Sequence, residues 1–348
     1  MKTANTKFYL SVILTVSGFI AAILVNLFFP FDADKKLSDF KITGNFGEPL
    51  RRLPIPEADL PGFFYRLVVL ALILLYIGTA IYAFADRDKT AAGRRAKFIS
   101  RAPFRGAVGV VLALWDIMGS KLVIFQQPFF PGPTRIVEAF IIETDFIWQN
   151  TLYSLRLFTF GFILGVFAGV LTGTLIGWFD KAYYWVFPVL KITGVIPAVA
   201  WMPFALTLFP SPFSAAVFLI VICAWFPVAF LTASGIKSTP RTYFEAARTL
   251  GAKTPYLVFR VALPHALPQI FTGISTALSG AFLTLVMAEM MGQPGGLGYY
   301  INASKVWGAY YKVFASIFVM AILFSLIMKA VAFIQRRALR WQAGVTKN

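Results

Sequence analysis

Long apolar stretches separated by short polar segments dominate the chain. A helix needs about 20 mostly apolar residues to cross the hydrocarbon core of a bilayer. Eight stretches meet or nearly meet this length: Phe8–Phe29, Phe63–Ala85, Ala107–Phe125, Tyr153–Gly177, Thr193–Phe209, Phe213–Gly235, Pro268–Met291 and Val313–Ile334. The pattern predicts an all-α polytopic membrane protein with about eight transmembrane helices.

The composition agrees with a membrane location. Hydrophobic residues make up 58% of the 348 residues and charged residues only 14%, with a mean hydropathy of +0.73. A soluble domain carries about 25% charged residues, so an ordinary cytosolic enzyme and a disordered chain are both excluded. The single cysteine, Cys223, and the single histidine, His265, exclude a disulfide framework and a histidine-rich metal centre. We therefore expect this chain to bind no metal and no cofactor.

Polar segments divide the chain into two expected parts. Residues 1–106 form a two-helix N-terminal extension with an external loop (30–62) and a basic cytoplasmic linker (86–106). The first span follows Lys2 and Lys7 like a signal peptide, but it lacks a small-residue cleavage site, so we interpret it as a retained anchor. Residues 107–342 contain the other six spans. A short amphipathic external helix is expected at Pro133–Ile147.

Basic residues indicate the orientation of the spans. The formal net charge is +17. If the N-terminus is cytoplasmic, 20 lysines and arginines outside the spans lie inside and 8 lie outside. Cytoplasmic loops of membrane proteins carry an excess of these residues. The split predicts that both termini are cytoplasmic, and it explains the basic charge without nucleic acid as a partner.

The fourth span carries five glycines at a four-residue period. This period places them on one slowly drifting stripe of a helix, where a neighbouring helix backbone can approach closely. The stripe predicts either static packing or a seam that slides between conformations. The glycines are Gly161, Gly165, Gly169, Gly173 and Gly177.

The loop at 236–267 contains start and stop signals for two short helices. Thr239 can cap the first helix with Pro240 at its first position. Gly251 suits the left-handed residue that ends this helix. Thr254 and Pro255 repeat the start signal, and we expect the second helix to stop at the two following prolines, Pro264 and Pro268.

The first of these helices has the composition of a docking element. Phe244, Ala247 and Leu250 are expected on one apolar face. Arg241, Glu245 and Arg248 are spaced to form ion pairs. A protruding helix with a small apolar face is typical of peptide and protein recognition in a groove.

The same loop resembles the EAA loop of ABC importer permeases. Glu245-Ala246-Ala247, three residues, Gly251, nine residues, Val261, one residue and Leu263-Pro264 match that pattern, with Val261 in place of isoleucine. Residues 288–292 and 296–299, and residues 130–134 ahead of 151–156, are similar to the sulfonate, taurine and nitrate branch of these permeases. The resemblance covers residues 107–342, so residues 1–106 lie outside the usual pattern.

The resemblance implies a fold, partners and a location. It implies a type I ABC importer core of about six helices, with two extra N-terminal helices, in the bacterial inner membrane. Two permease subunits, expected to be a homodimer, would form the pathway for a solute that an external solute-binding protein delivers. Cytoplasmic ATPase subunits would bind ATP and Mg. By this resemblance the ATPase-coupling residues are Glu245, Ala246, Ala247, Gly251, Val261, Leu263 and Pro264.

The chain itself is not expected to be an enzyme. It has no Gly-x4-Gly-Lys-Ser/Thr phosphate loop and no His-Glu-x-x-His motif. Five residues are candidates for the pathway or its gate. Each candidate has an alternative role. Glu289 can instead be a carboxylate at the membrane interface, and the serine and threonine hydroxyls can bond to carbonyls of their own helix. Trp201 can instead pack in the core. The candidates are Glu289, Ser275, Ser279, Thr284 and Trp201.

Two other functions fit a polytopic chain less well. A secondary transporter without an ATPase would show inverted repeats and ionisable residues at the midplane of the membrane, and neither is clear. A membrane enzyme would need a catalytic cluster, and none is visible in the sequence. The sequence does not identify the solute.

Overall fold

The computed structural model describes residues 2–29, 60–85, 89–122, 124 and 128–341. These residues form helices and turns, and no β-strand occurs among them. The chain divides into two compact units. The first consists of Met1–Phe146 and Ser304–Ala315, and the second of Ile147–Ala303 and Ser316–Asn348. The expected external loop at 30–62 lies almost wholly outside the described residues.

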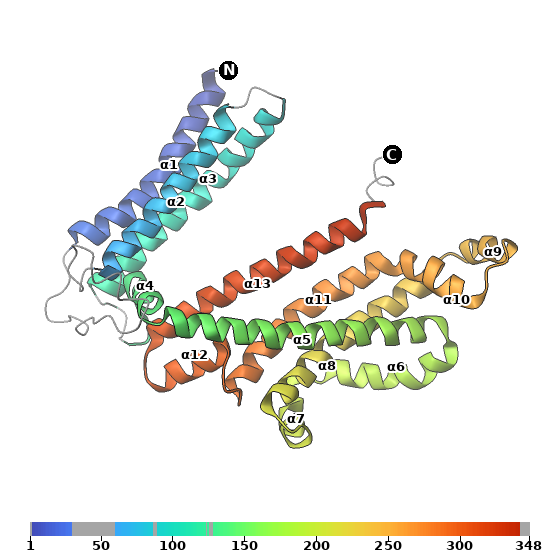
Figure 1. The fold of residues 1–348 in the computed structure, drawn as a ribbon. Helices are drawn as coiled ribbons and strands as arrows, with labels where there is room; N and C mark the ends of the chain where they lie inside the picture. The colour runs from blue at the N-terminus through green and yellow to red at the C-terminus, as the bar shows by residue number, and fades with distance from the viewer. Residues whose placement is uncertain (1, 30–59, 86–88, 123, 125–127, 342–348) are drawn as a thin grey trace. The chain divides into compact units, whose positions relative to one another are not determined.

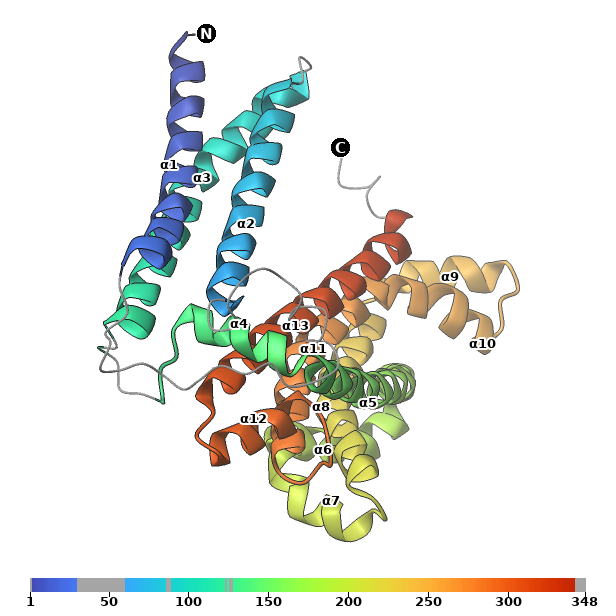
Figure 2. The same ribbon diagram turned by 60° about the vertical axis from the view of Figure 1, so that its left-hand side comes forward.

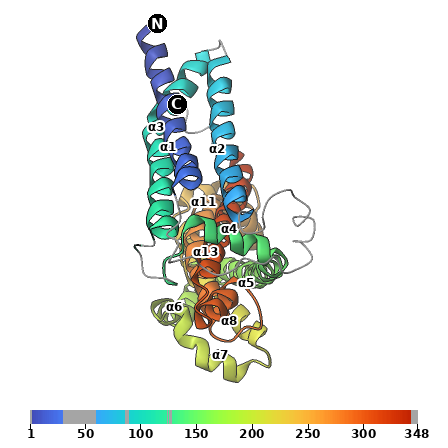
Figure 3. The same ribbon diagram turned by 90° about the vertical axis from the view of Figure 1, so that its left-hand side faces the viewer.

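Among its described residues up to Phe146, the first unit contains three long helices and one short helix (Figure 1). Figures 2 and 3 show the three long helices, α1, α2 and α3, side by side. A π-helical turn, Ile117–Lys121, extends α3 before the short helix α4. The bounds are α1 Lys2–Phe28, α2 Leu60–Ala85, α3 Lys89–Asp116 and α4 Pro133–Ile142.

Helices α1 and α3 touch backbone to backbone. A Cβ added to Gly18 would lie 2.3 Å from the carbonyl oxygen of Gly106, and one added to Gly109 would lie 2.4 Å from the carbonyl carbon of Gly18. Such close approach requires small residues, as in other membrane helix pairs. The N-terminal helices are therefore packed tightly onto the helix that follows them.

Buried polar side chains link one end of α1 to α3 and α4. The Asn26 amide donates to Asp116 Oδ2 at 3.0 Å and to Thr134 Oγ1 at 3.3 Å. Lys121 Nζ donates to the Asn26 carbonyl oxygen at 3.0 Å, and Arg66 donates to the Asn26 side chain at 3.1 Å. Asp116 and Lys121 therefore both bond to Asn26.

The second unit is built around α5, α8 and α11, which pack together (Figure 1). A 3-10 turn, Ala198–Trp201, precedes α7, and a π-helical turn, Leu257–Ala262, joins α10 to α11. Helices α12 and α13 cross the division between the units. The bounds are α5 Thr144–Trp178, α6 Asp180–Val195, α7 Met202–Leu208, α8 Pro212–Lys237, α9 Arg241–Thr249, α10 Thr254–Tyr256, α11 Leu263–Met290, α12 Leu297–Val306 and α13 Tyr310–Ala338.

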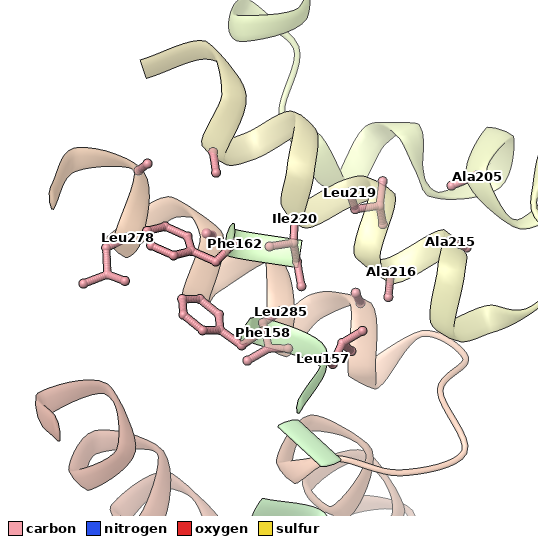
Figure 4. Close-up of a cluster of buried hydrophobic side chains, with 14 of the residues drawn as sticks. Leu157, Phe158, Phe162, Ala205, Ala215, Ala216, Leu219, Ile220, Leu278 and Leu285 are labelled. Carbon is pink, nitrogen blue, oxygen red and sulfur yellow. The ribbon is translucent and has the colours of Figure 1, made fainter. Parts of the chain in front are cut away.

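The core of the second unit lies where α5, α8 and α11 meet. Phe158 and Phe162 of α5 stack with ring centroids 5.1 Å apart. Figure 4 shows them beside Ile220 of α8 and Leu278 of α11. The faces of these helices that point away from the core also carry apolar side chains, such as Phe167, Phe230 and Leu283. Such faces are expected where lipid rather than water surrounds the helices.

Seven helices of the described residues are long and apolar enough to cross a membrane, or eight if one bent pair counts as a span. This confirms the predicted all-α polytopic fold. The fifth predicted span, Thr193–Phe209, is wrong as a single helix, because α6 and residues 198–208 meet at 99°. Pro197 has no N–H for a continuing helix, which explains the break.

Two other boundaries differ from the prediction. The external helix expected at Pro133–Ile147 ends at Ile142, and α5 begins at Thr144, nine residues before the predicted span. The basic segment is not a separate linker from Lys89 onward, because those residues are the first turns of α3. The expected boundary at residue 106 consequently falls inside a continuous helix, although Pro103 also lies in it.

Candidate functional site

The EAA loop (residues 236–267) begins with a sharp change of direction after α8. The Thr239 hydroxyl donates to the Gly235 carbonyl oxygen at 3.4 Å, in the last turn of α8. The predicted cap by Thr239 is therefore wrong, because its side chain is directed backward. Pro240 instead occupies the capping position with an extended backbone, and α9 begins at Arg241.

Gly251 ends α9 in the left-handed conformation that the sequence predicted. Its φ is +83°. The Gly251 N–H donates to the Arg248 carbonyl oxygen at 2.9 Å, and the Ala252 N–H donates to that of Ala247 at 3.0 Å. These bonds satisfy two carbonyls that a helix end leaves without partners. The turn at Gly251 therefore has a single, well-bonded geometry.

Helix α9 turns one face toward the second unit and leaves the other exposed. The Phe244 ring packs edge-on against Trp178 at the end of α5, with centroids 5.4 Å apart. The predicted apolar docking face is therefore wrong in part, since Phe244 packs inward and Ala247 is half-buried beside it. The exposed face carries Glu245, Ala246 and Leu250, and Leu250 is 88% exposed.

Glu245 is available to a partner. Its side chain is exposed. The predicted ion pairs with Arg241 and Arg248 do not form within the described part of the chain, where the ion pairs are Arg135–Glu138 and Lys312–Glu143. The exposed face of α9 therefore offers both a negative charge, at Glu245, and an apolar side chain, Leu250.

The second half of the loop is continuous with a membrane helix. Residues 254–290 run without interruption through α10, the π-helical turn and α11. The prediction that Pro264 and Pro268 stop the second helix is wrong. The wider π-helical turn precedes Pro264, which lies in the first turn of α11 where a missing N–H is tolerated.

The remaining residues of the EAA pattern lie at the base of the loop and not at its exposed tip. Val261, Leu263 and Pro264 are all half-buried. Leu263 packs with Phe244 against a cluster that includes Ile236 of α8 and Ala266 of α11. The base therefore joins α9 to two long helices through direct packing.

The five predicted glycines of α5 all face α8. A Cβ added to any of them would lie within 3.0 Å of an α8 atom, for example 2.7 Å from Ile220 Cβ at Gly161 and 2.7 Å from Val228 Cβ at Gly169. Gly165, Gly173 and Gly177 meet α8 in the same way. The stripe brings α5 and α8 into close contact from Gly161 to Gly177.

Glu289 lies at the opposite end of α11 and holds a glycine-rich turn. It is 1% exposed. Its Oε2 accepts a hydrogen bond from the Gly298 N–H at 2.8 Å. A Cβ on Gly296, whose φ is +110°, would lie 2.4 Å from the Glu289 carboxyl carbon. The carboxylate thus packs directly against the turn that joins α11 to α12.

Three residues that the sequence did not single out hold the same turn. Asn150 Oδ1 accepts from the Gly296 N–H at 2.9 Å, and Ser154 Oγ accepts from the Leu297 N–H at 2.8 Å. Tyr153 donates to Gln293 Oε1 at 2.9 Å. Asn150 and Ser154 are buried polar residues one turn apart in α5, and this spacing was the available signal.

The remaining pathway candidates differ in their surroundings. Thr284 is buried and donates to the Gly280 carbonyl oxygen at 3.0 Å, so its hydroxyl serves the helix backbone. Trp201 packs against the core cluster of the second unit. Ser275 is half-buried and Ser279 exposed on α11, and within the described residues no hydrogen bond engages either hydroxyl. The structure does not bring these four residues and Glu289 into one cluster.

Comparisons with known proteins identify relatives of this arrangement. Residues 161–341 match the family model described as binding-protein-dependent transport system inner membrane component. A permease protein of Bacillus subtilis named for aliphatic sulfonates transport is 32% identical over 67% of this chain and 85% of its own length. The nitrate import permease protein NrtB of Synechococcus elongatus is 29% identical over 60% of this chain and 76% of its own. The taurine transport system permease protein TauC of Escherichia coli is 27% identical over 69% and 90%.

Proposed function

Because the chain belongs to the family of binding-protein-dependent transport system inner membrane components, we propose that it is the permease subunit of an ATP-driven importer. It forms the membrane pathway for a small solute that an external solute-binding protein delivers. A separate cytoplasmic ATPase binds ATP and Mg and supplies the energy. The chain is a multi-pass inner membrane protein, and its family is one of non-catalytic membrane subunits.

The geometry of the EAA loop is the observation that carries this proposal. Its exposed face presents Glu245, Ala246 and Leu250, while its buried face is fixed by Phe244. Such a surface suits insertion into a cleft of the ATPase. Gly251 keeps the end of α9 compact, so the chain can turn close to the partner.

The same loop provides a path for force into the membrane. Phe244 packs on Trp178 of α5, and the base of the loop is continuous with α11. A movement of α9 imposed by the ATPase is therefore transmitted to α5 and α11 as rigid helices. The proposal also includes the contact between the glycine stripe of α5 and helix α8. The two helices slide along this contact during transport.

The resemblance implies a homodimer, with one copy of this chain on each side of the pathway. Ser275 and Ser279 lie one turn apart on α11 and retain free hydroxyls among the described residues, so we assign them to the pathway lining. Relatives are named for sulfonates, taurine and nitrate, so small oxyanions are the first solutes to test.

Reconstitution tests the proposal. The chain is purified with an ATPase subunit and a solute-binding protein from the same organism, and the complex is placed in liposomes with or without ATP. We expect uptake of the solute carried by the binding protein, dependent on ATP and on both partners. Uptake driven by a proton or sodium gradient without the ATPase would instead establish a secondary transporter and overturn the proposal.

A further inference from the structure

Four basic side chains form a stripe on α3, beside the last turns of α2. Their spacing of three, four and four residues places them on one face of the helix. The stripe and the last turns of α2 enclose a groove of about 160 Å³. This basic groove is lined by Thr79, Tyr82, Ala83, Arg94, Lys97, Phe98, Arg101 and Arg105.

Aromatic rings lie against two cations of the basic groove, Arg94 and Arg105. The Arg105 guanidinium lies 4.9 Å from the Tyr76 ring centroid and 4.8 Å from that of Phe98. Arg94 lies 5.0 Å from the Tyr82 ring centroid. Aromatic faces attract cations without neutralising them. No aspartate or glutamate is among the described residues that line the groove.

One guanidinium nitrogen of Arg105 is buried and has no hydrogen-bond partner among the described residues. A buried N–H of a charged group that makes no hydrogen bond is costly. An anion in the groove would remove this cost. Lys97 and Arg101 are exposed at the mouth of the groove, where they would meet the same anion.

The sequence around the groove supports a strong local positive charge. Residues 86–105 contain seven lysines and arginines and two aspartates, Asp86 and Asp88, which leaves a formal charge of +5. Repulsion among these cations is reduced by the two aspartates, by screening or by a bound anion. The groove therefore selects for negatively charged ligands.

The position of the groove identifies the source of the anion. Both α2 and α3 are long and apolar enough to cross a membrane. Apolar side chains beside the groove are exposed, including Ile81, Phe84 and Phe104, the last of which is 74% exposed. The groove therefore lies where polar headgroups meet acyl chains, at a depth that a nucleic acid does not reach.

We propose that the basic groove binds the phosphate of an anionic phospholipid headgroup, with the acyl chains lying along the exposed apolar side chains of α2 and α3. Basic pockets between membrane helices on the side rich in lysine and arginine bind such headgroups. This gives the N-terminal helices a role separate from transport: they anchor a lipid beside the permease. The proposal does not depend on the identity of the transported solute.

Lipid titration of the purified full-length complex in neutral detergent tests this site. Bound phosphatidylglycerol and phosphatidylcholine with identical acyl chains are counted by native mass spectrometry. The test variant is the double substitution Lys97→Gln and Arg101→Gln, because both side chains are exposed and their loss leaves the packing around Arg105 intact. We expect about a tenfold loss of phosphatidylglycerol affinity, and no change for phosphatidylcholine.

The matched control is Arg336→Gln with Arg337→Gln, which removes the same charge from exposed positions in the last turn of α13. It should bind phosphatidylglycerol like the wild type. The melting temperature provides a second readout, because phosphatidylglycerol should raise it for the wild type and the control but not for the groove variant.

Three results would overturn the proposal. The groove variant could retain wild-type affinity for phosphatidylglycerol. The control could lose as much affinity as the groove variant, which would show a general charge effect. Millimolar inorganic phosphate could displace the lipid from the wild type, which would assign the groove to a free anion. If the double glutamine variant is unstable without lipid, Lys97→Arg with Arg101→Lys must retain binding.

Discussion

At Gly251 a single backbone conformation shapes the surface of the EAA loop. Its φ is +83°, yet an added Cβ would have no atom within 4 Å. The isolated chain therefore has room for a side chain at this position. Any defect caused by a substitution must come from the left-handed backbone or from a partner that covers the loop.

Replacing Gly251 by phenylalanine should abolish uptake without reducing the amount of protein in the membrane. A residue with a Cβ costs about 1 kcal/mol or more in the left-handed conformation, and the ring would also obstruct a docked ATPase. The measurement is ATP-dependent uptake, with stimulation of the ATPase by the loaded binding protein. Wild-type uptake by the Gly251→Phe complex would show that this loop is not the coupling element.

Asparagine separates the two causes at this position. It tolerates the left-handed conformation better than other residues with a Cβ, and its side chain is smaller than that of phenylalanine. Gly251→Asn should therefore retain a large part of the uptake. Equal loss in both variants would indicate that any side chain at this position collides with the partner.

Substitutions of Glu289 should distinguish a role in holding the turn from a role of the charge. Glu289→Ala leaves the buried Gly298 N–H without its acceptor, which costs about 1–3 kcal/mol. Glu289→Gln keeps an oxygen acceptor in place. We expect a lower melting temperature for the alanine variant and a nearly unchanged one for glutamine. Loss of uptake in the glutamine variant at normal stability would instead assign the charge itself to the gate.

These two residues also show what the sequence can predict at this scale. Gly251 was predictable because a left-handed helix end depends on local chain geometry, which glycine permits. The partners of Glu289 were not predictable, because the turn after α11 brings the Gly298 N–H to its carboxylate. Asn150 and Ser154 bond to the same turn from a helix more than 130 residues earlier in the sequence.

Among the helices, α5 and α8 form a contact that the sequence predicted only in part. The four-residue period of glycines identified the face of α5 but not its partner. All five glycines meet α8, at separations that leave no space for a methyl group. The contact therefore depends on the absence of side chains along a whole helix face.

Alanine at Gly169 should lower the stability of the protein, whereas alanine at Gly78 should raise it. Both glycines lie inside membrane helices, and alanine is favoured over glycine in a helix by about 0.5–1 kcal/mol. At Gly169 the new Cβ would lie 2.7 Å from Val228 Cβ, but at Gly78 it would meet nothing within 4 Å. Overpacking costs about 1–3 kcal/mol. Thermal unfolding in detergent measures both, and a stabilised Gly169→Ala variant would contradict close packing of α5 on α8.

Proline signals were less reliable than glycine signals for the helices. Pro264 and Pro268 were expected to end a helix, but residues 254–290 are continuous. A π-helical turn before Pro264 widens the helix locally, and sequence patterns do not reveal such turns. Pro197 does break its span, by 99°, because no wider turn compensates there.

For the whole molecule, hydropathy predicted the number of spans well, because each membrane helix must satisfy its backbone hydrogen bonds internally. The division into two units was not predictable. Residues 304–315 belong with the first unit, although more than 150 residues separate them from residue 146 in the sequence. Hydropathy describes each helix alone and contains no information on which helices pack together.

The orientation of the chain in the membrane is the last prediction, and it follows from the 20:8 distribution of lysine and arginine. Trp307 is 85% exposed between α12 and α13, and Lys253 is exposed in the EAA loop. Single cysteines at these positions, in a background without Cys223, are treated with a membrane-impermeant thiol reagent. Trp307→Cys should react in intact cells, and Lys253→Cys only after lysis.

Gln293 lies at the same end of α11 as Glu289, but it is a poor position for this measurement. Its side chain is 3% exposed and bonded to Tyr153, so a cysteine there would react slowly on either side of the membrane. Trp307 and Lys253 are both exposed, so a slow reaction there cannot be caused by burial of the cysteine. If Lys253→Cys reacts in intact cells while Trp307→Cys requires lysis, the chain has the opposite orientation. The EAA loop would then lie outside, where no ATPase could dock, and the proposed coupling would be excluded along with the topology.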